Sequence, residues 1–220
     1  MSDGAPATRA QRLRTAAFGE HHTMHDDTFT VLGLAGSLGR RSYNRALLAA
    51  AIESAPEGIE VSSMGLADVP MYNPDFDEHL GSGGPFPAAV EELVERVSAA
   101  DALLLVTPEY NWGPSGVLKN ALDWVSRPVG ASPLFEKPVA LAGVSPGPAG
   151  TGRAQLQLRE HLLSTNSYVL QQPVVQIGDG KRRFDAELRL TDEGTRELLV
   201  AQLEALREWA RRMAPRAVRG

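Results

Sequence analysis

The chain has 220 residues, a formal net charge of −5 and no cysteine, and 43% of its residues are hydrophobic. This length and composition suit one α/β domain with a complete core. The lack of cysteine excludes disulfides, thiolate catalysis and cysteine-bound metals, and the acidic balance argues against a general nucleic-acid binder. No apolar run reaches the roughly 18 residues that a membrane-spanning helix needs. We expect a cytoplasmic enzyme or carrier that binds neither nucleic acid nor membrane.

Residues 1–27 are polar, irregular and rich in small side chains, and they predict a disordered tail. Three histidines in this stretch, His21, His22 and His25, are compatible with adventitious metal binding, and no functional metal site is expected there. Met24 is equally acceptable as the true start of translation, so the tail contributes nothing to the functional prediction.

From Phe29 onward, strand patterns alternate with helix patterns. Strands are predicted at Phe29–Ala35, Ile59–Met64, Ala102–Val106, Lys137–Ser145 and Tyr168–Ile177, the last interrupted by Pro173. Helices are predicted at Ser42–Ala55, Pro87–Ala100, Ser115–Ser126, Gly152–Leu163 and Thr191–Met213, the last capped by Thr191. Such alternation predicts a parallel, doubly wound sheet in one domain that covers residues 28–215.

Three loops rich in glycine and polar residues each follow a predicted strand. They cover residues 36–44, 107–116 and 144–152. In a doubly wound sheet the loops after the first, third and fourth strands lie together at the carboxyl edge, where ligands bind. The sequence therefore predicts a ligand site built from three separate parts of the chain.

The first loop reads Gly36-Ser-Leu-Gly-Arg-Arg-Ser-Tyr-Asn44 and leads into a helix. Hydroxyls, arginines and the helix N-terminus suit a phosphate group. An ordinary strand-to-helix turn, with Ser42 as the cap and the arginines in solvent, explains the same residues equally well. The glycine spacing matches neither the dinucleotide fingerprint nor a Walker loop.

The second loop places Tyr110, Asn111 and Trp112 together, and aromatic surface beside amide donors suits a planar heterocycle. Packing of Trp112 in a core or a subunit contact is the alternative. The third loop, Val144-Ser-Pro-Gly-Pro-Ala-Gly-Thr-Gly152, allows close backbone approach to a flat ligand or serves as a connector. A phosphate site combined with a planar-ring site suggests flavin mononucleotide, FMN.

These loops resemble those of the NAD(P)H-dependent FMN reductases of flavodoxin-like fold, which include quinone, azo-dye and chromate reductases. Residues 36–44 are similar to the motif G-S-x-R-x-x-S-x-N, and residues 108–124 to P-E-Y-N-x-S-x-P-G-x-L-K-N-x-x-D-W. Residues 137–147 are similar to K-P-V-A-x-x-G-x-S-x-G. The resemblance covers residues 29–190 and implies a three-layer sandwich with a five-stranded parallel sheet of order 2-1-3-4-5.

The resemblance also implies which residues bind FMN. The first loop would hold the phosphate, the second would line the flavin ring, and the third would lie on its other side. The residues concerned are Ser37, Gly39, Arg40, Ser42, Tyr43, Asn44, Pro108, Glu109, Tyr110, Asn111, Trp112, Ser145 and Gly147. No side chain is expected to be catalytic, because the chemistry belongs to the cofactor.

The chain departs from these motifs at a few positions. Gly39 stands where an arginine is usual, and the neighbouring Arg40 is a candidate substitute. Trp112, Gly113 and Ser115 also differ from the usual residues, with Pro114 shifted by one position. We expect these changes around the ring pocket to affect the choice of electron acceptor.

Other polar residues receive structural roles. Glu109 is expected to shape its loop or pair at a subunit contact, and Lys119 with Asp123 to form a surface or interface pair. His79 and His161 are expected at the surface, because neither has a nucleophile or carboxylate at a sequence spacing that would indicate a catalytic pair.

The resemblance implies an oxidoreductase that passes hydride from NADPH or NADH through bound FMN to a small acceptor. Quinones, free flavin, azo compounds and metal oxyanions are candidate acceptors, and a homodimer or homotetramer is implied. Two alternatives remain at this point. One is a flavodoxin-type electron carrier, and the other is a flavin-fold binding protein without turnover.

Overall fold

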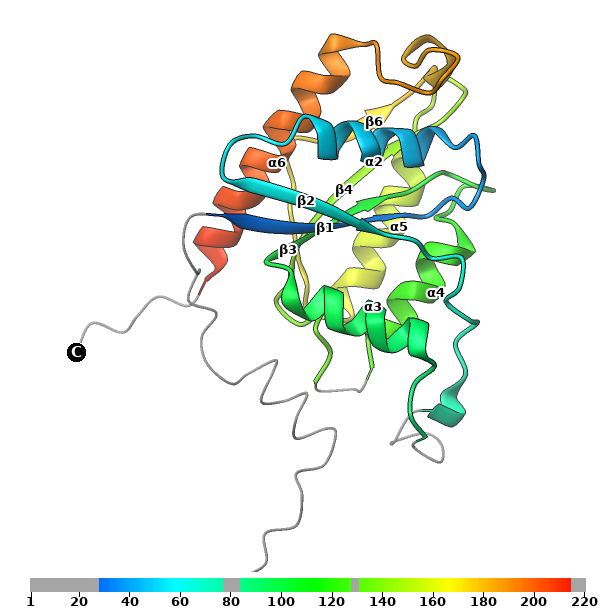
Figure 1. Cartoon of the computed structure of the whole chain (residues 1–220), viewed down its shortest axis with the longest axis vertical. Helices are drawn as coiled ribbons and strands as arrows, with labels where there is room; N and C mark the ends of the chain where they lie inside the picture. Colours follow the sequence, from blue (N-terminus) through cyan, green and yellow to red (C-terminus); the bar gives the residue numbers. More distant parts are fainter. Residues whose placement is uncertain (1–27, 77–83, 128–130, 215–220) are drawn as a thin grey trace, which may run out of the picture.

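A parallel sheet forms the centre of the structure, a computed structural model that describes residues 28–76, 84–127 and 131–214 (Figure 1). Its strands are β1 (Phe29–Ala35), β2 (Ile59–Met64), β3 (Ala102–Val106), β4 (Pro138–Val144), β5 (Tyr168–Val169) and β6 (Val175–Ile177). The order is β2-β1-β3-β4-β5, and β6 also pairs with β4. The predicted 2-1-3-4-5 order is confirmed.

The fifth position of the sheet is divided between two short strands. β5 pairs with the first half of β4, from Pro138, and β6 pairs with the second half, up to Val144. The break between them contains Pro173, which has no N–H to donate to a ladder. The interruption predicted at this proline is confirmed.

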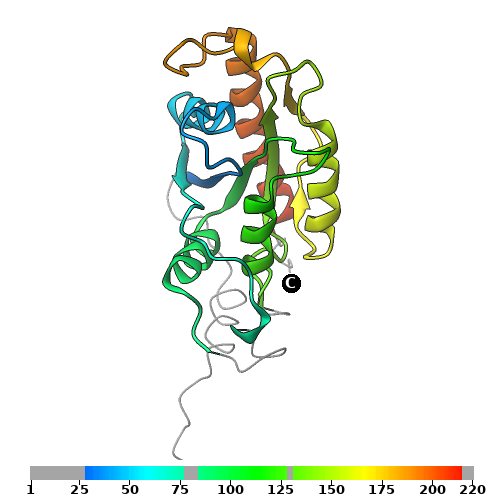
Figure 2. The same cartoon turned by 90° about the vertical axis from the view of Figure 1, so that its right-hand side faces the viewer.

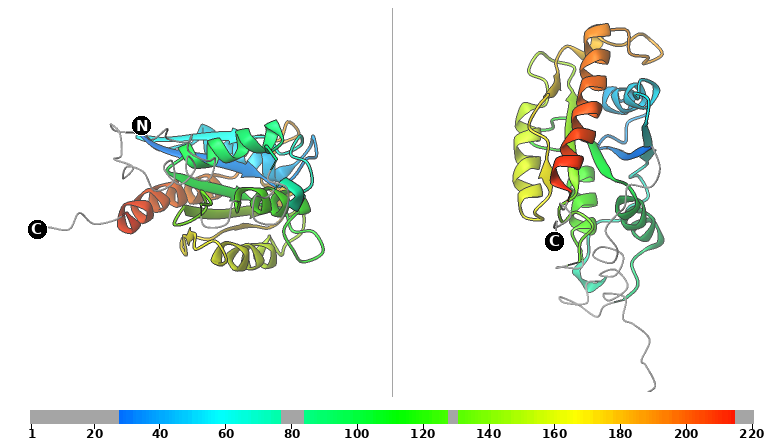
Figure 3. Two further views of the ribbon diagram at one scale, coloured as in Figure 1. Left: turned by 90° about the horizontal axis from the view of Figure 1, so that it is seen from below. Right: turned by 90° about the vertical axis from the view of Figure 1, so that its left-hand side faces the viewer.

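Helices cover both faces of the sheet (Figures 2 and 3). They are α2 (Tyr43–Glu53), α3 (Ala88–Ala99), α4 (Gly116–Val125), α5 (Gly152–Leu163) and α6 (Glu193–Met213), with short 3-10 helices η1 (Pro74–Phe76) and η2 (Gly180–Arg182). α2 and α6 pack into one hydrophobic cluster, and α3, α4 and α5 pack into the other. The right panel of Figure 3 shows α6 along the sheet between α5 and α2.

The central strand β3 explains why two cores form. Leu104 and Val106 belong to the cluster with α2 and α6, whereas Leu103 and Leu105 belong to the cluster on the opposite face. Successive side chains of a strand point to opposite faces, and a strand buried on both sides reads as a continuous apolar run. The run predicted from residues 102 to 106 is therefore fully buried.

The start of α6 differs from the prediction that Thr191 caps it. Asp192 is the N-cap, and its carboxylate accepts hydrogen bonds from the Thr195 N–H at 2.9 Å and the Thr195 hydroxyl at 2.6 Å. Thr191 instead donates its N–H and hydroxyl to the carbonyl of Arg183. The aspartate is the stronger cap because its negative charge faces the positive end of the helix.

Some predictions concern residues outside the described ranges. These are the tail of residues 1–27 with its three histidines, and His79. Among the helices of the three described ranges, none combines the length and apolar character needed to cross a membrane.

Candidate functional site

The first two loops contact each other at the carboxyl edge of the sheet. The Gly36 N–H donates to the carbonyl of Val106 at 2.9 Å. A Cβ atom at Gly36 would lie 2.5 Å from the Ser115 hydroxyl oxygen and 3.3 Å from Pro108. The first loop can approach the second this closely only because residue 36 is glycine.

The second and third loops meet in the same way. The Thr107 N–H donates to Ala142, and a Cβ atom at Gly143 would lie 2.3 Å from the Thr107 carbonyl oxygen. The same Cβ would lie 2.2 Å from the Thr151 hydroxyl oxygen. The structure thus brings the three loops to one edge, as the sequence predicted.

Asn44 lies in this region, but its amide is occupied by the protein itself. Its Nδ2 donates to the Val144 carbonyl at 2.9 Å, and its Oδ1 accepts from the Val144 N–H at 3.0 Å. The side chain is buried and ties the start of α2 to the end of β4. Its contacts identify it as a residue that positions the loop.

Ser42 is the N-cap of α2, where its hydroxyl accepts a hydrogen bond from the Arg45 N–H at 3.2 Å. Ser42 thus caps the helix, as the alternative expected, and a capping serine still leaves other N–H groups of the first turn free for a ligand. Ser37 is 8% exposed and makes no hydrogen bond to another described residue. Its hydroxyl is available to a ligand.

The charge around the start of α2 favours an anion. The first turn contains no acidic residue and instead carries Arg45, although acidic side chains are the favoured ones at a helix N-terminus. Arg40 is exposed, and within the described ranges it forms no hydrogen bond or ion pair. Gly39 is exposed as well, and a Cβ atom there would meet only the Ser37 hydroxyl oxygen, at an ordinary contact distance of 3.8 Å, so no packing requirement explains the glycine.

The second loop forms a tight turn at its tip. Tyr110 and Gly113 exchange two backbone hydrogen bonds of 2.9 and 3.0 Å. The two central residues, Asn111 and Trp112, have φ angles of 50° and 70°, as a type I′ turn requires. The Tyr110 N–H is thus used within the turn. The backbone hydrogen bonds of the described residues include none from the Asn111 N–H.

Trp112 is held in place although its side chain is 68% exposed. The Arg153 guanidinium lies 4.5 Å from the centre of its ring, and Gln157 donates to its carbonyl at 2.9 Å. The alternative that this tryptophan packs in the core of the chain is wrong. A bulky side chain at positive φ is strained, and such strain persists where surrounding contacts enforce it.

Glu109 has a structural role that joins two of the loops. Its carboxylate accepts hydrogen bonds from the backbone N–H groups of Arg153, at 2.9 Å, and Ala154, at 3.1 Å. These groups belong to the first turn of α5, so Glu109 caps this helix from a distant part of the chain. The expectation that it shapes its loop agrees with these contacts.

A hollow of about 360 Å³ lies beside Glu109 and the start of α5, lined by Glu109, Ala149, Gly152, Arg153, Leu156 and Gln176.

The third loop is held by the segment that follows β6. The Ser145 N–H donates to Ile177, and the Ser145 carbonyl accepts from Gly180 at 2.9 Å. The Ser145 hydroxyl and the Asp179 N–H both donate to the Gly147 carbonyl at 2.8 Å. Ser145 and Gly147 therefore lie at the site as expected, with their polar groups engaged in shaping the loop.

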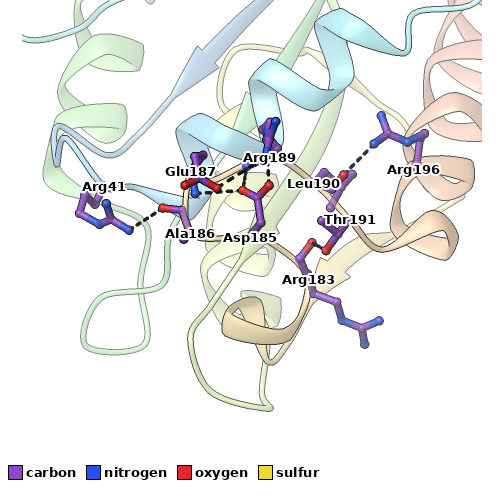
Figure 4. Close-up of polar contacts among 9 residues, drawn as sticks. All are labelled: Arg41, Arg183, Asp185, Ala186, Glu187, Arg189, Leu190, Thr191 and Arg196. Carbon is purple, nitrogen blue, oxygen red and sulfur yellow. Dashed lines mark hydrogen bonds and ion pairs between the residues drawn. The ribbon is translucent and has the colours of Figure 1, made fainter.

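The segment of residues 178–190, which we call the strap, was missed by the sequence-based interpretation. Arg41 donates to the carbonyl of Ala186 at 2.9 Å (Figure 4). Tyr43 packs against Phe184 with ring centres 5.5 Å apart. The strap is thus a fourth segment of the site, beside the first loop. Its only sequence signal was Phe184 between two polar stretches, which has no regular period.

The remaining polar residues also have observed positions. Lys119 and Asp123 form an i, i+4 ion pair of 2.6 Å, as expected. His161 is half-buried rather than at the surface, and its Nδ1 has no partner within the described part of the chain. Burial and the nearby Lys119 lower the pKa of His161. In that same part, no group of three acidic or histidine residues could hold a metal ion.

The residues present fit a flavin mononucleotide. The first loop offers the free Ser37 hydroxyl, the unneutralised start of α2 and the exposed Arg40 to a phosphate. The turn of the second loop presents the Asn111 N–H beside aromatic surface. Gly36 lets the first loop approach the second, and Gly143 lets the third loop approach the second.

Comparison with known proteins gives the family. Residues 29–182 match the model of the family described as NADPH-dependent FMN reductase. The chain is 46% identical over 187 residues to the NAD(P)H-dependent FMN reductase PA1204 of Pseudomonas aeruginosa, which covers 85% of this chain and 98% of the relative. It is 36% identical over 185 residues to a quinone reductase of Escherichia coli K12, and this match covers 83% of this chain and 96% of the relative.

A solved structure agrees with these relatives. FerB, a flavoenzyme NAD(P)H:(acceptor) oxidoreductase from Paracoccus denitrificans, superposes with a TM-score of 0.75 at 31% identity. The match covers 86% of this chain and all of that one. The flavodoxin-like fold and the enzymatic nature predicted from the sequence are confirmed. The chain belongs to the NADPH-dependent FMN reductase family.

Proposed function

We propose that this enzyme binds FMN at the carboxyl edge of its sheet and uses NADPH or NADH to reduce a quinone. The observation that carries the proposal is the start of α2, where Ser37, the helix N-terminus and Arg40 face no acidic side chain of their own loop. Relatives described as quinone reductases support the acceptor class.

The chain supplies binding and orientation. Ser37, Ser42, Arg40 and the first N–H groups of α2 would hold the phosphate, while Asn44 keeps this loop fixed to β4. The turn at Asn111 would meet the polar edge of the ring. FMN, when bound, takes up a hydride equivalent and passes electrons on, whereas the protein positions and tunes it.

Exposed apolar side chains support the proposal of a homodimer or homotetramer. Tyr110, Trp112, Leu156 and Leu163 are 55 to 78% exposed and lie on the second loop and α5. Scattered exposed apolar residues are ordinary, but several on neighbouring elements are typical of an interface. Light scattering of the purified protein measures its molar mass and so tests the oligomeric state. We also propose that the protein lies in the cytoplasm.

Steady-state kinetics test the activity. We expect NADPH consumption by the FMN-loaded enzyme to depend on added menadione and to saturate with it. A flavodoxin-type carrier would bind flavin yet turn over slowly with menadione and ferricyanide alike. A protein that retains the fold but neither binds FMN nor consumes NADPH would contradict the proposal.

A further inference from the structure

The basic residues of the strap fall into two groups. Arg183 pairs with Asp192 at 2.7 Å. Arg189 pairs with Asp185 at 2.8 Å (Figure 4). Asp185 also accepts hydrogen bonds from the backbone N–H groups of Glu187 and Arg189. These two arginines are therefore neutralised and serve to fold the strap.

Other cations near the strap have no acidic partner. Lys181, Arg182 and Arg40 are exposed and form no ion pair or side-chain hydrogen bond within the described ranges. We call these three residues the basic rim. Arg41 donates only to a carbonyl oxygen, so its charge is not neutralised either.

The rim borders the proposed phosphate loop. Lys181 and Arg182 belong to η2, which begins at Gly180. A Cβ atom at Gly180 would lie 3.4 Å from the Tyr43 ring and 3.1 Å from the Ser145 carbonyl oxygen. Residue 180 is thus in van der Waals contact with the first and third loops.

Contacts on the other side of the first loop complete this placement. Arg41, next to Arg40, reaches the strap at Ala186. The two parts of the rim therefore belong to segments that are joined both at Tyr43 and at Arg41.

Charge explains what such an arrangement favours. Cations placed together repel one another, and the start of α2 adds further positive potential. Among the acidic residues of the strap, Asp179 is the one that forms no ion pair within the described ranges. The chain as a whole carries a net negative charge. A group with two negative charges would be drawn to this spot and would relieve the repulsion.

We propose that the basic rim is a subsite for a phosphate monoester of a nucleotide. Such a group carries close to two negative charges at neutral pH. The proposal rests on the proposed function, which supplies two sources of this group: the 5′-phosphate of FMN and the 2′-phosphate of NADPH. Lys181, Arg182 and Arg40 would act through charge, in place of the arginine absent at Gly39.

The test compares ligands that differ only by this phosphate. Lys181→Gln with Arg182→Gln, and separately Arg40→Gln, are measured against the control Arg212→Gln. Arg212 is an exposed cation in the last turn of α6. The C-terminal end of this helix, red in Figure 1, lies away from the strap. Affinities for FMN and riboflavin are obtained by fluorescence, and kcat/KM is obtained for NADPH and NADH.

Two results support the subsite and identify its ligand. If the rim holds FMN, the rim variants lose about tenfold in FMN affinity, while riboflavin affinity stays unchanged. If it holds the dinucleotide, the ratio of kcat/KM for NADPH over NADH falls about tenfold in Lys181→Gln with Arg182→Gln, whose NADH kinetics stay unchanged. Lys181→Arg with Arg182→Lys, which preserves both charges, should behave as the wild type.

Two other results overturn it. Suppose that the wild type binds FMN and oxidises NADPH, and that the rim variants match Arg212→Gln both in FMN affinity relative to riboflavin and in kcat/KM for NADPH relative to NADH. This result refutes the subsite alone. A wild type that retains neither FMN nor NADPH oxidation refutes the proposed function and the subsite with it.

Discussion

Two polar residues of the first loop have different roles despite their similar place in the motif. The Asn44 amide forms hydrogen bonds with both backbone groups of Val144, whereas Ser37 is also buried but has no hydrogen-bond partner among the described residues. The cost of losing a side chain depends on what it leaves unsatisfied. Stability and ligand affinity should therefore separate at these two positions.

Ser37→Ala is predicted to weaken FMN binding by about 1.5–3 kcal/mol, because a hydrogen bond to a charged phosphate is lost. The free energy of unfolding should stay unchanged, since no contact within the described protein is removed. Titration with FMN and with riboflavin, which has no phosphate, checks the origin of the loss. An equal loss for both ligands would show that Ser37 does not contact the phosphate.

Asn44→Ala is predicted to lower the free energy of unfolding by about 2–3 kcal/mol, because it leaves the N–H and C=O of Val144 without partners in a buried site. Urea unfolding of the variant without FMN measures this, with Ser37→Ala as the control. A variant as stable as that control would mean that the amide does not tie α2 to β4.

At the scale of the elements, the site depends on loops that approach each other very closely. Gly143 and Gly147 both belong to the end of β4 and its loop, but their surroundings differ. A Cβ at Gly143 would overlap Thr107 and Thr151, whereas a Cβ at Gly147 would meet no atom within 4 Å. Close approach of the second and third loops is thus concentrated at Gly143.

Gly143→Ala is predicted to destabilise the protein by about 1–3 kcal/mol or more through overpacking, and to weaken FMN binding as the loops separate. Gly147→Ala is the matched control, and it should change the free energy of unfolding by less than about 0.5 kcal/mol. Thermal unfolding of both variants measures this difference in stability. Equal behaviour of the two alanines would contradict the packing described here.

At the opposite edge of the sheet, Lys137 holds the end of α3. Its Nζ donates to the Ala100 carbonyl at 2.5 Å and lies 3.5 Å from that of Ser98. Burial lowers the pKa of Lys137 from 10.5 to about 8, although Asp101 opposes the shift. Between these two values the unfolded chain binds more protons than the folded one, so the folded state gains stability as pH rises.

The stability of the wild type relative to Lys137→Met is therefore predicted to increase by about 1–3 kcal/mol from pH 8 to pH 10. Urea unfolding at several pH values measures the difference, and groups common to both proteins cancel. A difference that is constant or falls over this range would show that the lysine keeps its ordinary pKa.

For the molecule as a whole, the pattern of apolar residues was sufficient to predict the sheet. The run from Ala102 to Val106 and its neighbours predicted the strands, and Pro173 predicted the break in the fifth position. The three loops could be placed together because parallel strands share one carboxyl edge.

The rest of the site depends on contacts between distant residues, which no local pattern reveals. The strap has no periodic sequence and is recognised only through Arg41, Tyr43 and Phe184, which lie far apart in the chain. The cap that Glu109 provides to α5 spans 44 residues. Asn44 resembled a ligand-binding amide because its partner, Val144, is 100 residues away.

The central claim is that FMN binds at the loops of the carboxyl edge and is reduced there by NADPH. The most direct measurement is the visible absorption spectrum of the protein after incubation with FMN and gel filtration, recorded without oxygen before and after NADPH is added. We predict about one flavin retained per chain, with its visible band bleached by NADPH and restored by a quinone. Protein that elutes without flavin, or with flavin that NADPH leaves oxidised, would contradict the claim.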